Sequence, residues 1–371
     1  MTSRLLTAEF VFPGHPDKLC DAIADTLVAE ARQRERRALV GVEVAVHRNN
    51  VFVTGRVGCA NAATIDVDAV VRNVYRSAGY GNGWYPAPED LVVHNALCLG
   101  DLEEGEAEFR ELSDDQCICV GYAVDMAETN YQPVEQWLVR ALARRLYAVR
   151  LEAPELLLGP DGKVLVVVRW NGDQWELVEF SCSLQQMNEG SSVALHRAVR
   201  QLLQAELAQL ARQFSKLAAS VPQQITVNGA GAFEAGGPEG DNGLSGKKLV
   251  MDAYGPRVPI GGGAWSGKDF FKADRAGGLH ARRLAKLIVE LGLAREATVT
   301  LGWFPGDRVA RVLDVVADEF ETARAVKLAQ LLDLSLANSG ERLGEGVDCV
   351  ELARWGHFAE STAVWEVPCA V

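Results

Sequence analysis

The chain has 371 residues, of which 48% are hydrophobic and 23% are charged, and its formal net charge is −13 at pH 7. This ordinary globular composition excludes a disordered, collagen-like or coiled-coil chain, and the length suggests about two or three domains. The acidic excess, with a sequence pI of about 5.1, argues against a surface devoted to nucleic acid or to an anionic membrane, so any polyphosphate site must be built locally.

Membrane and secretory signals are not evident in the sequence. No apolar run approaches the roughly 18 residues that a membrane helix requires, and the N-terminus does not have the pattern of a secretory signal. The eight cysteines are scattered, and only Cys117 and Cys119 lie close together. A structural zinc site would need a second pair at ligand spacing nearby. We therefore expect a cytoplasmic protein with reduced thiols and no zinc.

One pattern occurs three times along the chain: an amphipathic helix, two strands joined by a turn, and a second helix. The first copy predicts helices at 19–31 and 67–74 and strands at 39–47 and 51–58, with a turn at Asn49-Asn50. The second copy predicts helices at 134–141 and 199–214 and strands at 164–170 and 175–182. The third copy predicts helices at 284–291 and 320–332 and strands at 297–304 and 308–316.

The repeat predicts an α+β fold of three similar subdomains in a pseudo-threefold arrangement, each a small sheet covered by helices. We expect an N-terminal subdomain at 1–103, a central subdomain at 112–233 and a C-terminal subdomain at 234–371. Helices would cover one face of each sheet, so the other face needs cover from a neighbouring subdomain or from a second chain. The pattern therefore favours a dimer.

The segment GHPDK at 14–18 lies directly before the first predicted helix. His15, Asp17 and Lys18 would gather at the helix N-terminus, where free backbone amides favour an anion. The alternative is that Pro16 and Asp17 merely start the helix.

Two glycine-rich segments, at 236–248 and 261–275, carry the lysines Lys247, Lys248, Lys268 and Lys272. Four cations beside so much glycine suit a triphosphate better than a single phosphate. Asp17 and Asp274 could then supply carboxylate oxygens to Mg²⁺. The second segment nearly matches a P-loop, but Asp269 stands where a hydroxyl is required, which excludes that motif. The alternative is a pair of solvated, lysine-rich loops.

These segments resemble the S-adenosylmethionine synthetases (methionine adenosyltransferases). The resemblance rests on GHPDK at 14–18, DQ at 115–116, GYA at 121–123, GGPEGDNGLSGKK at 236–248, GGGAWSGKDFFKADR at 261–275 and GHF at 356–358. The family's fold of three α+β subdomains agrees with the repeat. The resemblance implies attack of methionine sulfur on C5′ of ATP, with release of triphosphate that is then cleaved to pyrophosphate and phosphate.

The resemblance also implies roles for individual residues. The implied catalytic set is His15, Lys18, Lys163, Lys248 and Lys268. The implied ATP contacts are His15, Asp161, Lys163, Phe233, Asp241, Lys247, Lys248, Ala264 and Lys268. Asp17 and Asp274 match Mg²⁺ positions, and Glu43 matches the K⁺ carboxylate. A homodimer or homotetramer with shared sites is implied, with ATP and methionine or a related acceptor as substrates, and with no nucleic-acid or membrane partner.

The acceptor half of the implied site departs from the family pattern. The implied acceptor contacts are Arg56, Asp115, Gln116, Asp241 and Lys272, but the family has Glu at the position of Arg56, to receive the methionine ammonium. An Arg repels an ammonium and binds anions. The segment at 97–112 is also altered and acidic. Three hypotheses remain: an S-adenosylmethionine synthetase, the same ATP chemistry on a more anionic acceptor, or a non-catalytic regulatory homologue.

Overall fold

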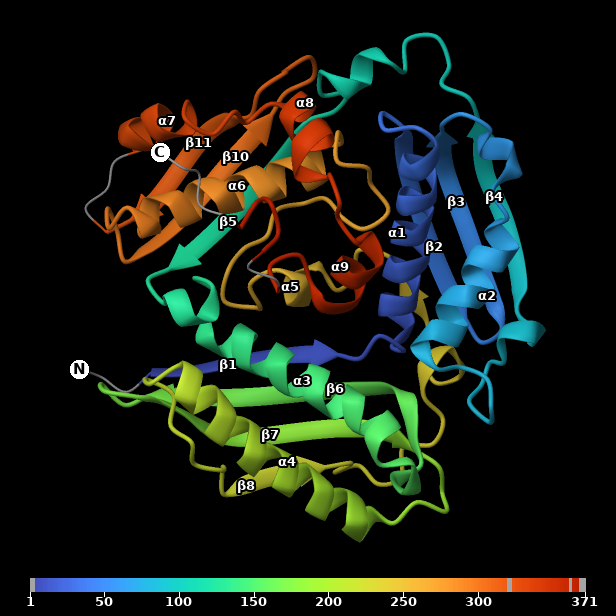
Figure 1. The fold of residues 1–371 in the computed structure, drawn as a ribbon, viewed down its shortest axis with the longest axis vertical. Helices are drawn as coiled ribbons and strands as arrows, with labels where there is room; N and C mark the ends of the chain where they lie inside the picture. The colour runs from blue at the N-terminus through green and yellow to red at the C-terminus, as the bar shows by residue number, and fades with distance from the viewer. Residues whose placement is uncertain (1–3, 319–321, 360–361, 367–371) are drawn as a thin grey trace.

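The structure is a computed structural model, and it describes residues 4–318, 322–359 and 362–366. Figure 1 shows three sheets around a centre that holds the short helices α5 (Leu249–Asp252) and α9 (Cys349–Trp355). Helices pack against each sheet, and buried apolar side chains form three clusters. The predicted α+β fold with three sheets is confirmed.

The first sheet has the strand order β4-β3-β2-β9. Its strands are β2 (Leu39–His47), β3 (Asn50–Gly58), β4 (Val92–Gly100) and β9 (Gly243–Leu244), and its helices are α1 (Pro16–Arg34) and α2 (Val67–Ala78). The predicted β2–β3 hairpin is confirmed, but its turn is formed by Arg48 and Asn49, because Asn50 already pairs with His47. Arg48 adopts a left-handed conformation with φ 50°.

The second sheet has the order β1-β6-β7-β8. Its strands are β1 (Arg4–Val11), β6 (Leu158–Trp170), β7 (Trp175–Gln186) and β8 (Gln224–Val227), and its helices are α3 (Val134–Glu152) and α4 (Ser192–Gln213). The predicted β6–β7 hairpin is confirmed, and β6 begins six residues earlier than the prediction (164 − 158).

The third sheet has the order β11-β10-β5. Its strands are β5 (Cys117–Val124), β10 (Glu296–Trp303) and β11 (Arg311–Ala317), and its helices are α6 (Ala273–Glu290) and α7 (Thr322–Ala329), with α8 (Leu336–Asn338) following. The β10–β11 hairpin is confirmed. The first two residues of the helix predicted at 320–332 lie outside the described residues, and the described helix ends at Ala329.

Two of the sheets include a strand that lies outside their own repeat copy in the sequence. β1 precedes the first repeat but pairs along its whole length with β6, from Arg4 opposite Trp170 to Val11 opposite Lys163. Likewise β5 precedes the second repeat and pairs with β10 of the third. β1 and β5 therefore connect subdomains that lie apart in the sequence. No helix in the described part of the chain combines the length and apolar composition needed to cross a membrane.

Phe10 of β1 shows how closely this first strand is built into the core. Its ring is fully buried and stacks on Trp355 of α9 with centroids 6.0 Å apart. Phe10→Ala is expected to lower the free energy of unfolding by about 3–5 kcal/mol, because it leaves a large cavity. Leu151→Ala, on a side chain of α3 that is 74% exposed, is the control and should change it by less than about 0.5 kcal/mol. Urea unfolding at one protein concentration measures both; a cost below about 1 kcal/mol for Phe10→Ala would contradict this packing.

Candidate functional site

The N-terminus of α1 is the starting point of the site. His15 is the N-cap residue, and its Nδ1 accepts a hydrogen bond from Asp17 N at 3.2 Å. Pro16 occupies the first helical position, as helix-start statistics favour. Burial, reinforced by the nearby Lys248 ammonium, lowers the pKa of His15 to about 4. The imidazole is therefore neutral near pH 7 and can donate a hydrogen bond to an anion.

Asp17 and Lys18 point in different directions from this helix start. The buried Asp17 carboxylate accepts from Leu244 N at 2.9 Å and pairs with Lys248 Nζ at 2.6 Å. Lys18 is also buried, and its ammonium pairs with Asp252 in the interior. The structure thus brings His15 and Asp17 to the lysine-bearing loop, and it turns Lys18 away from that loop.

Both glycine-rich segments run along the edge of β2 that faces away from β3. Gly243 and Leu244 pair with Val46 and Ala45 as strand β9. Further along the same edge, Val42 N donates to Gly267 O at 2.9 Å. The two loops are therefore parts of one surface, with Lys247 and Lys248 at one point of the β2 edge and Lys268 at the next.

Each of four site lysines has a carboxylate partner. Lys248 pairs with Asp17 at 2.6 Å, Lys163 with Glu9 at 2.5 Å, Lys272 with Asp114 at 2.6 Å, and Lys268 with Asp274. Lys247 is half-exposed and lies 3.8 Å from Asp17. Lys247, Lys248, Lys268 and Lys272 are thus gathered around α1, β2 and the start of α6, whereas Lys163 lies on β6.

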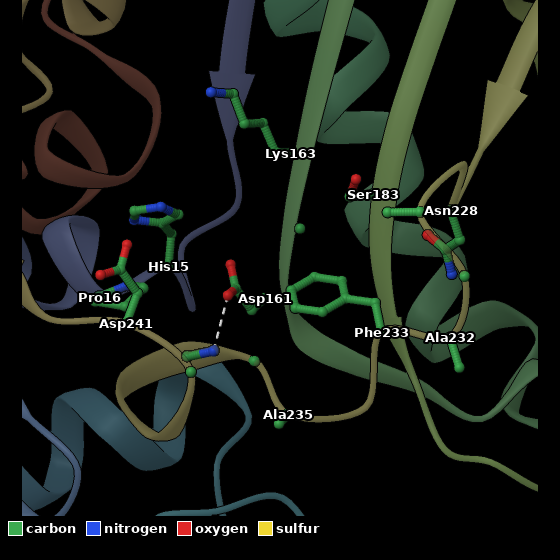
Figure 2. A pocket seen from close by; sticks show the side chains of 16 residues that line it. His15, Pro16, Asp161, Lys163, Ser183, Asn228, Ala232, Phe233, Ala235 and Asp241 are labelled. Atoms are coloured by element: carbon green, nitrogen blue, oxygen red, sulfur yellow. Dashed lines mark hydrogen bonds between the residues drawn. The ribbon is translucent and has the colours of Figure 1, made fainter.

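A cavity of about 380 Å³ lies between the start of α1 and the second sheet. Figure 2 shows the Phe233 ring and the Asp161 carboxylate on one side of it, and His15 and Asp241 on the other. Lys163 also lines it, where β6 passes the cavity. A flat aromatic ring opposite polar groups suits a nucleoside with a charged tail. The structure therefore brings five of the predicted ATP contacts together here.

Asp161 is buried at this cavity. Its Oδ2 accepts from Gly237 N at 2.7 Å, the bond drawn in Figure 2, so it fixes the start of the first glycine-rich segment. Burial raises the pKa of Asp161 to about 6, and the hydrogen bond from Gly237 opposes this shift.

A second cavity, of about 750 Å³, lies beside the third sheet. The predicted residues Asp115, Gln116 and Asp274 line it with Gly261–Gly263 and with apolar side chains, among them Trp303 and Phe304. No lining residue is shared with the first cavity. Ala264 contacts neither cavity; its methyl group lies against Gly246 and joins the two glycine-rich segments.

Asp17 and Asp274 have the donor chemistry that Mg²⁺ prefers. Each offers a carboxylate whose oxygens face an ammonium group, Lys248 or Lys268. The described residues include no group of three or more His, Cys, Asp or Glu side chains that could hold a metal unaided. A site of one or two carboxylates plus substrate phosphates and waters is typical of Mg²⁺. Glu43 is exposed on β2, beside the buried Val42 and Val44.

Arg56 of β3 is held by the acidic segment. Its Nε and Nη2 donate to the two carboxylate oxygens of Glu106 at 3.1 and 2.9 Å, and Nη2 also donates to Asp101 O at 2.6 Å. The hydrogen bond to Glu106 raises the pKa of Arg56, and the pKa of Glu106 is lowered in return. Arg110 ties the other end of this segment to Asp269 at 2.9 Å. The guanidinium predicted to meet an acceptor thus already has a bidentate partner.

Two acids that the sequence analysis did not single out also reach the loops. Asp21 Oδ1 accepts from Gly246 N at 2.7 Å, and Asp25 Oδ1 accepts from Gly267 N at 2.9 Å. Burial raises the pKa of Asp21 to about 8, and the Lys18 ammonium opposes the shift. The sequence could have identified these two acids by their four-residue spacing after Asp17, because such spacing places side chains on one helix face.

Models of the three domains of S-adenosylmethionine synthetase match this chain, the N-terminal domain at 3–94, the central domain at 110–233 and the C-terminal domain at 235–367. An S-adenosylmethionine synthase from Methylorubrum extorquens is 34% identical over 376 residues, which cover 95% of this chain and 92% of that protein. One from Methylobacterium radiotolerans is 32% identical, with coverage of 96% and 93%. The solved structure of "an Unusual S-adenosylmethionine synthetase from Campylobacter jejuni" superposes with a TM-score of 0.84 at 26% identity, covering 99% of this chain and 97% of that one.

The raised pKa of Asp161 predicts a pH-dependent stability. The folded state disfavours the ionised carboxylate, so stability falls as the pH rises from about 4 to about 6, and the loss is complete above about pH 6. The difference from the ordinary value of 3.8 corresponds to about 3 kcal/mol. Asp161→Asn keeps an acceptor for Gly237 N without the charge. The variant should therefore be more stable than the wild type at pH 7.5, by up to about 3 kcal/mol, and nearly equal at pH 4. Urea unfolding across this pH range measures the difference; a constant difference would contradict the assignment.

Proposed function

The chain belongs to the S-adenosylmethionine synthetase family, and from that premise we propose that its site transfers the adenosyl group of ATP to the sulfur of methionine. The observation that carries the proposal is the joining of two lysine-bearing glycine loops along the edge of β2, next to a cavity with an aromatic wall. Lysines on fixed loops suit a triphosphate, and the aromatic wall suits an adenine ring.

The reaction forms a bond from sulfur to C5′ and breaks the bond from C5′ to the triphosphate oxygen. The electron pair of that bond leaves with the triphosphate, so negative charge grows there as the bond breaks. Lys248, Lys268 and the neutral His15 imidazole would stabilise this charge, and Phe233 would hold the adenine. Fixed donors of this kind do not need to reorganise during the reaction. In the family the triphosphate is afterwards cleaved, and we propose the same here.

We propose that Mg²⁺ and K⁺ are the cofactors, as they generally are in this family. Asp17 and Asp274 would hold Mg²⁺ together with phosphate oxygens, where the ion neutralises charge on the triphosphate. Glu43 is proposed for K⁺. We assign Asp115, Gln116, Asp241 and Lys272 to the acceptor.

His15, Asp161, Lys163, Phe233 and Asp241 line the first cavity, whereas Asp115, Gln116 and Asp274 line the second. The two cavities share no lining residue, and this division supports a site shared between two chains. A homodimer or homotetramer in which one chain supplies the first set and its partner the second would join them around one ATP. The seven described cysteines are free thiols, which suits our proposal of a cytoplasmic location.

Mass spectrometry of a reaction with ATP, Mg²⁺ and K⁺, with and without methionine, tests the proposal. Methionine-dependent S-adenosylmethionine and equimolar pyrophosphate and phosphate are expected. Lys248→Ala should lower kcat/KM by about 100-fold or more, because one donor to the leaving charge is lost. Lys216→Ala, on an exposed lysine outside both cavities, is the control and should behave as the wild type. ATP binding without an adenosyl product would refute the proposal.

The pairing of Arg56 with Glu106 distinguishes methionine from a more anionic acceptor. Arg56→Glu places a carboxylate beside Glu106, and we expect it to lower the free energy of unfolding by about 1–3 kcal/mol and to reduce activity with methionine. Arg56→Glu combined with Glu106→Arg restores an ion pair and should recover most of both. Thermal unfolding and kcat/KM for a panel of acceptors are the measurements. A single variant that stays stable but prefers another acceptor would instead place Arg56 in direct contact with the acceptor.

A further inference from the structure

One face of α1 carries three buried carboxylates at four-residue spacing, Asp17, Asp21 and Asp25. Each accepts a backbone N–H from a lysine-bearing loop: Leu244 N at 2.9 Å, Gly246 N at 2.7 Å and Gly267 N at 2.9 Å, respectively. Side chains four residues apart lie above one another on a helix. The three acids therefore form a straight row beneath the two loops.

The glycines bound by this row directly precede the site lysines. Gly246 has φ 78° and is followed by Lys247 and Lys248, and Gly267 has φ 82° and is followed by Lys268. A Cβ at Gly246 would meet the Ala264 methyl at 2.4 Å, and one at Gly267 would meet Val42 O at 2.2 Å. The chain can turn here only as glycine, so the direction of each N–H fixes the direction in which the following lysine leaves the loop.

The opposite side of the loops is held by β2. Ser245 N donates to Val44 O at 2.9 Å, and Asp269 N donates to Val40 O at 3.1 Å. Arg275 adds a bond from the α6 side, because its Nη1 reaches both Asp25 Oδ1 at 2.8 Å and Lys268 O at 2.9 Å. Each loop is thus held between a helix carboxylate and a strand edge.

We propose that Asp21 and Asp25 are positioning residues, which fix the turns at Gly246 and Gly267 so that Lys248 and Lys268 face a bound triphosphate chain. The identity of that ligand rests on the proposed function. Asp17 differs from the other two, because it touches Lys248 itself. Asp21 and Asp25 reach the two loops through the backbone amides of Gly246 and Gly267 and contact neither Lys248 nor Lys268 directly. The lysines are thereby oriented before the ligand arrives, and less ordering is needed on binding.

Asp21 is the better position to test, because removing Asp25 would leave the fully buried Arg275 without its carboxylate partner. Asp21→Ala removes the acceptor for Gly246 N. Asp21→Asn keeps an oxygen acceptor and resembles the protonated acid. Ile23→Ala, at a fully buried position on the same helix that takes no part in the row, is the control for general destabilisation. Gly246→Ala disturbs the same hydrogen bond from the loop side and serves if Asp21→Ala does not fold.

Two readouts are needed: the Kd for inorganic triphosphate with Mg²⁺, by calorimetry, and kcat with saturating ATP and methionine. Asp21→Ala and Gly246→Ala should weaken triphosphate binding at least about 10-fold and lower kcat further. Asp21→Asn should stay within about 3-fold of the wild type in both. Ile23→Ala should keep the wild-type Kd and kcat per folded molecule, even if its melting temperature falls as far as that of Asp21→Ala.

A folded Asp21→Ala or Gly246→Ala protein with wild-type Kd would overturn the positioning role, as would equal losses in Ile23→Ala. Failure of the proposed function would give a different experimental result from failure of the positioning role. In that case the wild type itself would form no adenosyl product, while the triphosphate Kd would still separate Asp21→Ala from Asp21→Asn.

Discussion

The row of carboxylates on α1 is the constraint on which the rest of the site depends. Glycine-rich loops have many accessible conformations and lose much entropy when they are ordered. Here the loops lie between the edge of β2 and α1, so their N–H groups find acceptors on one side or the other. Helix α1 can serve this purpose because its apolar side, with Leu19, Ile23 and Leu27, is buried in the first core cluster. The same helix thus supports a sheet and organises two loops.

Much of the fold could be predicted because its units are local. Each of the three hairpins joins strands that are neighbours in sequence, and alternation together with turn residues is visible over about 20 residues. The partners of β1 and β5 could not be predicted in this way. β1 alternates like any half-buried strand, and nothing in residues 4–11 indicates that they pair with residues 163–170. Pairing over such a distance is decided by packing, as the burial of Phe10 against Trp355 illustrates.

In the candidate site, too, the residues that could be predicted are those whose signal is local in the sequence. The lysines were found because glycine and lysine in one segment are a local signal. Asp21 and Asp25 follow Asp17 at helical spacing, but an acid in each turn is also what a solvent-facing helix shows. Only the structure reveals that these acids are buried and that their partners lie more than 220 residues away. For Arg56 the sequence suggested a functional group that the structure shows to be already paired. Its charge predicted an open anion site, but its guanidinium pairs with Glu106, from an acidic segment to which the sequence analysis gave no role.

The pairing of the site lysines is consistent with the proposal that this acidic protein binds a polyanion. Ammonium groups gathered without counterions would repel one another and destabilise the fold. Asp17 and Asp274 lower this repulsion by pairing with Lys248 and Lys268. A triphosphate that enters the site offers oxygens that compete for the same ammonium groups. In the proposed complex the lysines would pair with the phosphates, and a divalent cation held by Asp17 and Asp274 would take the place of their ammonium partners. Proposed binding of this kind would exchange partners among charged groups that are already paired, so little desolvation of unpaired charge would be required. The carboxylates that stabilise the free protein are therefore the same groups proposed to hold the metal, and neither purpose could be met by a loop that carried lysines alone.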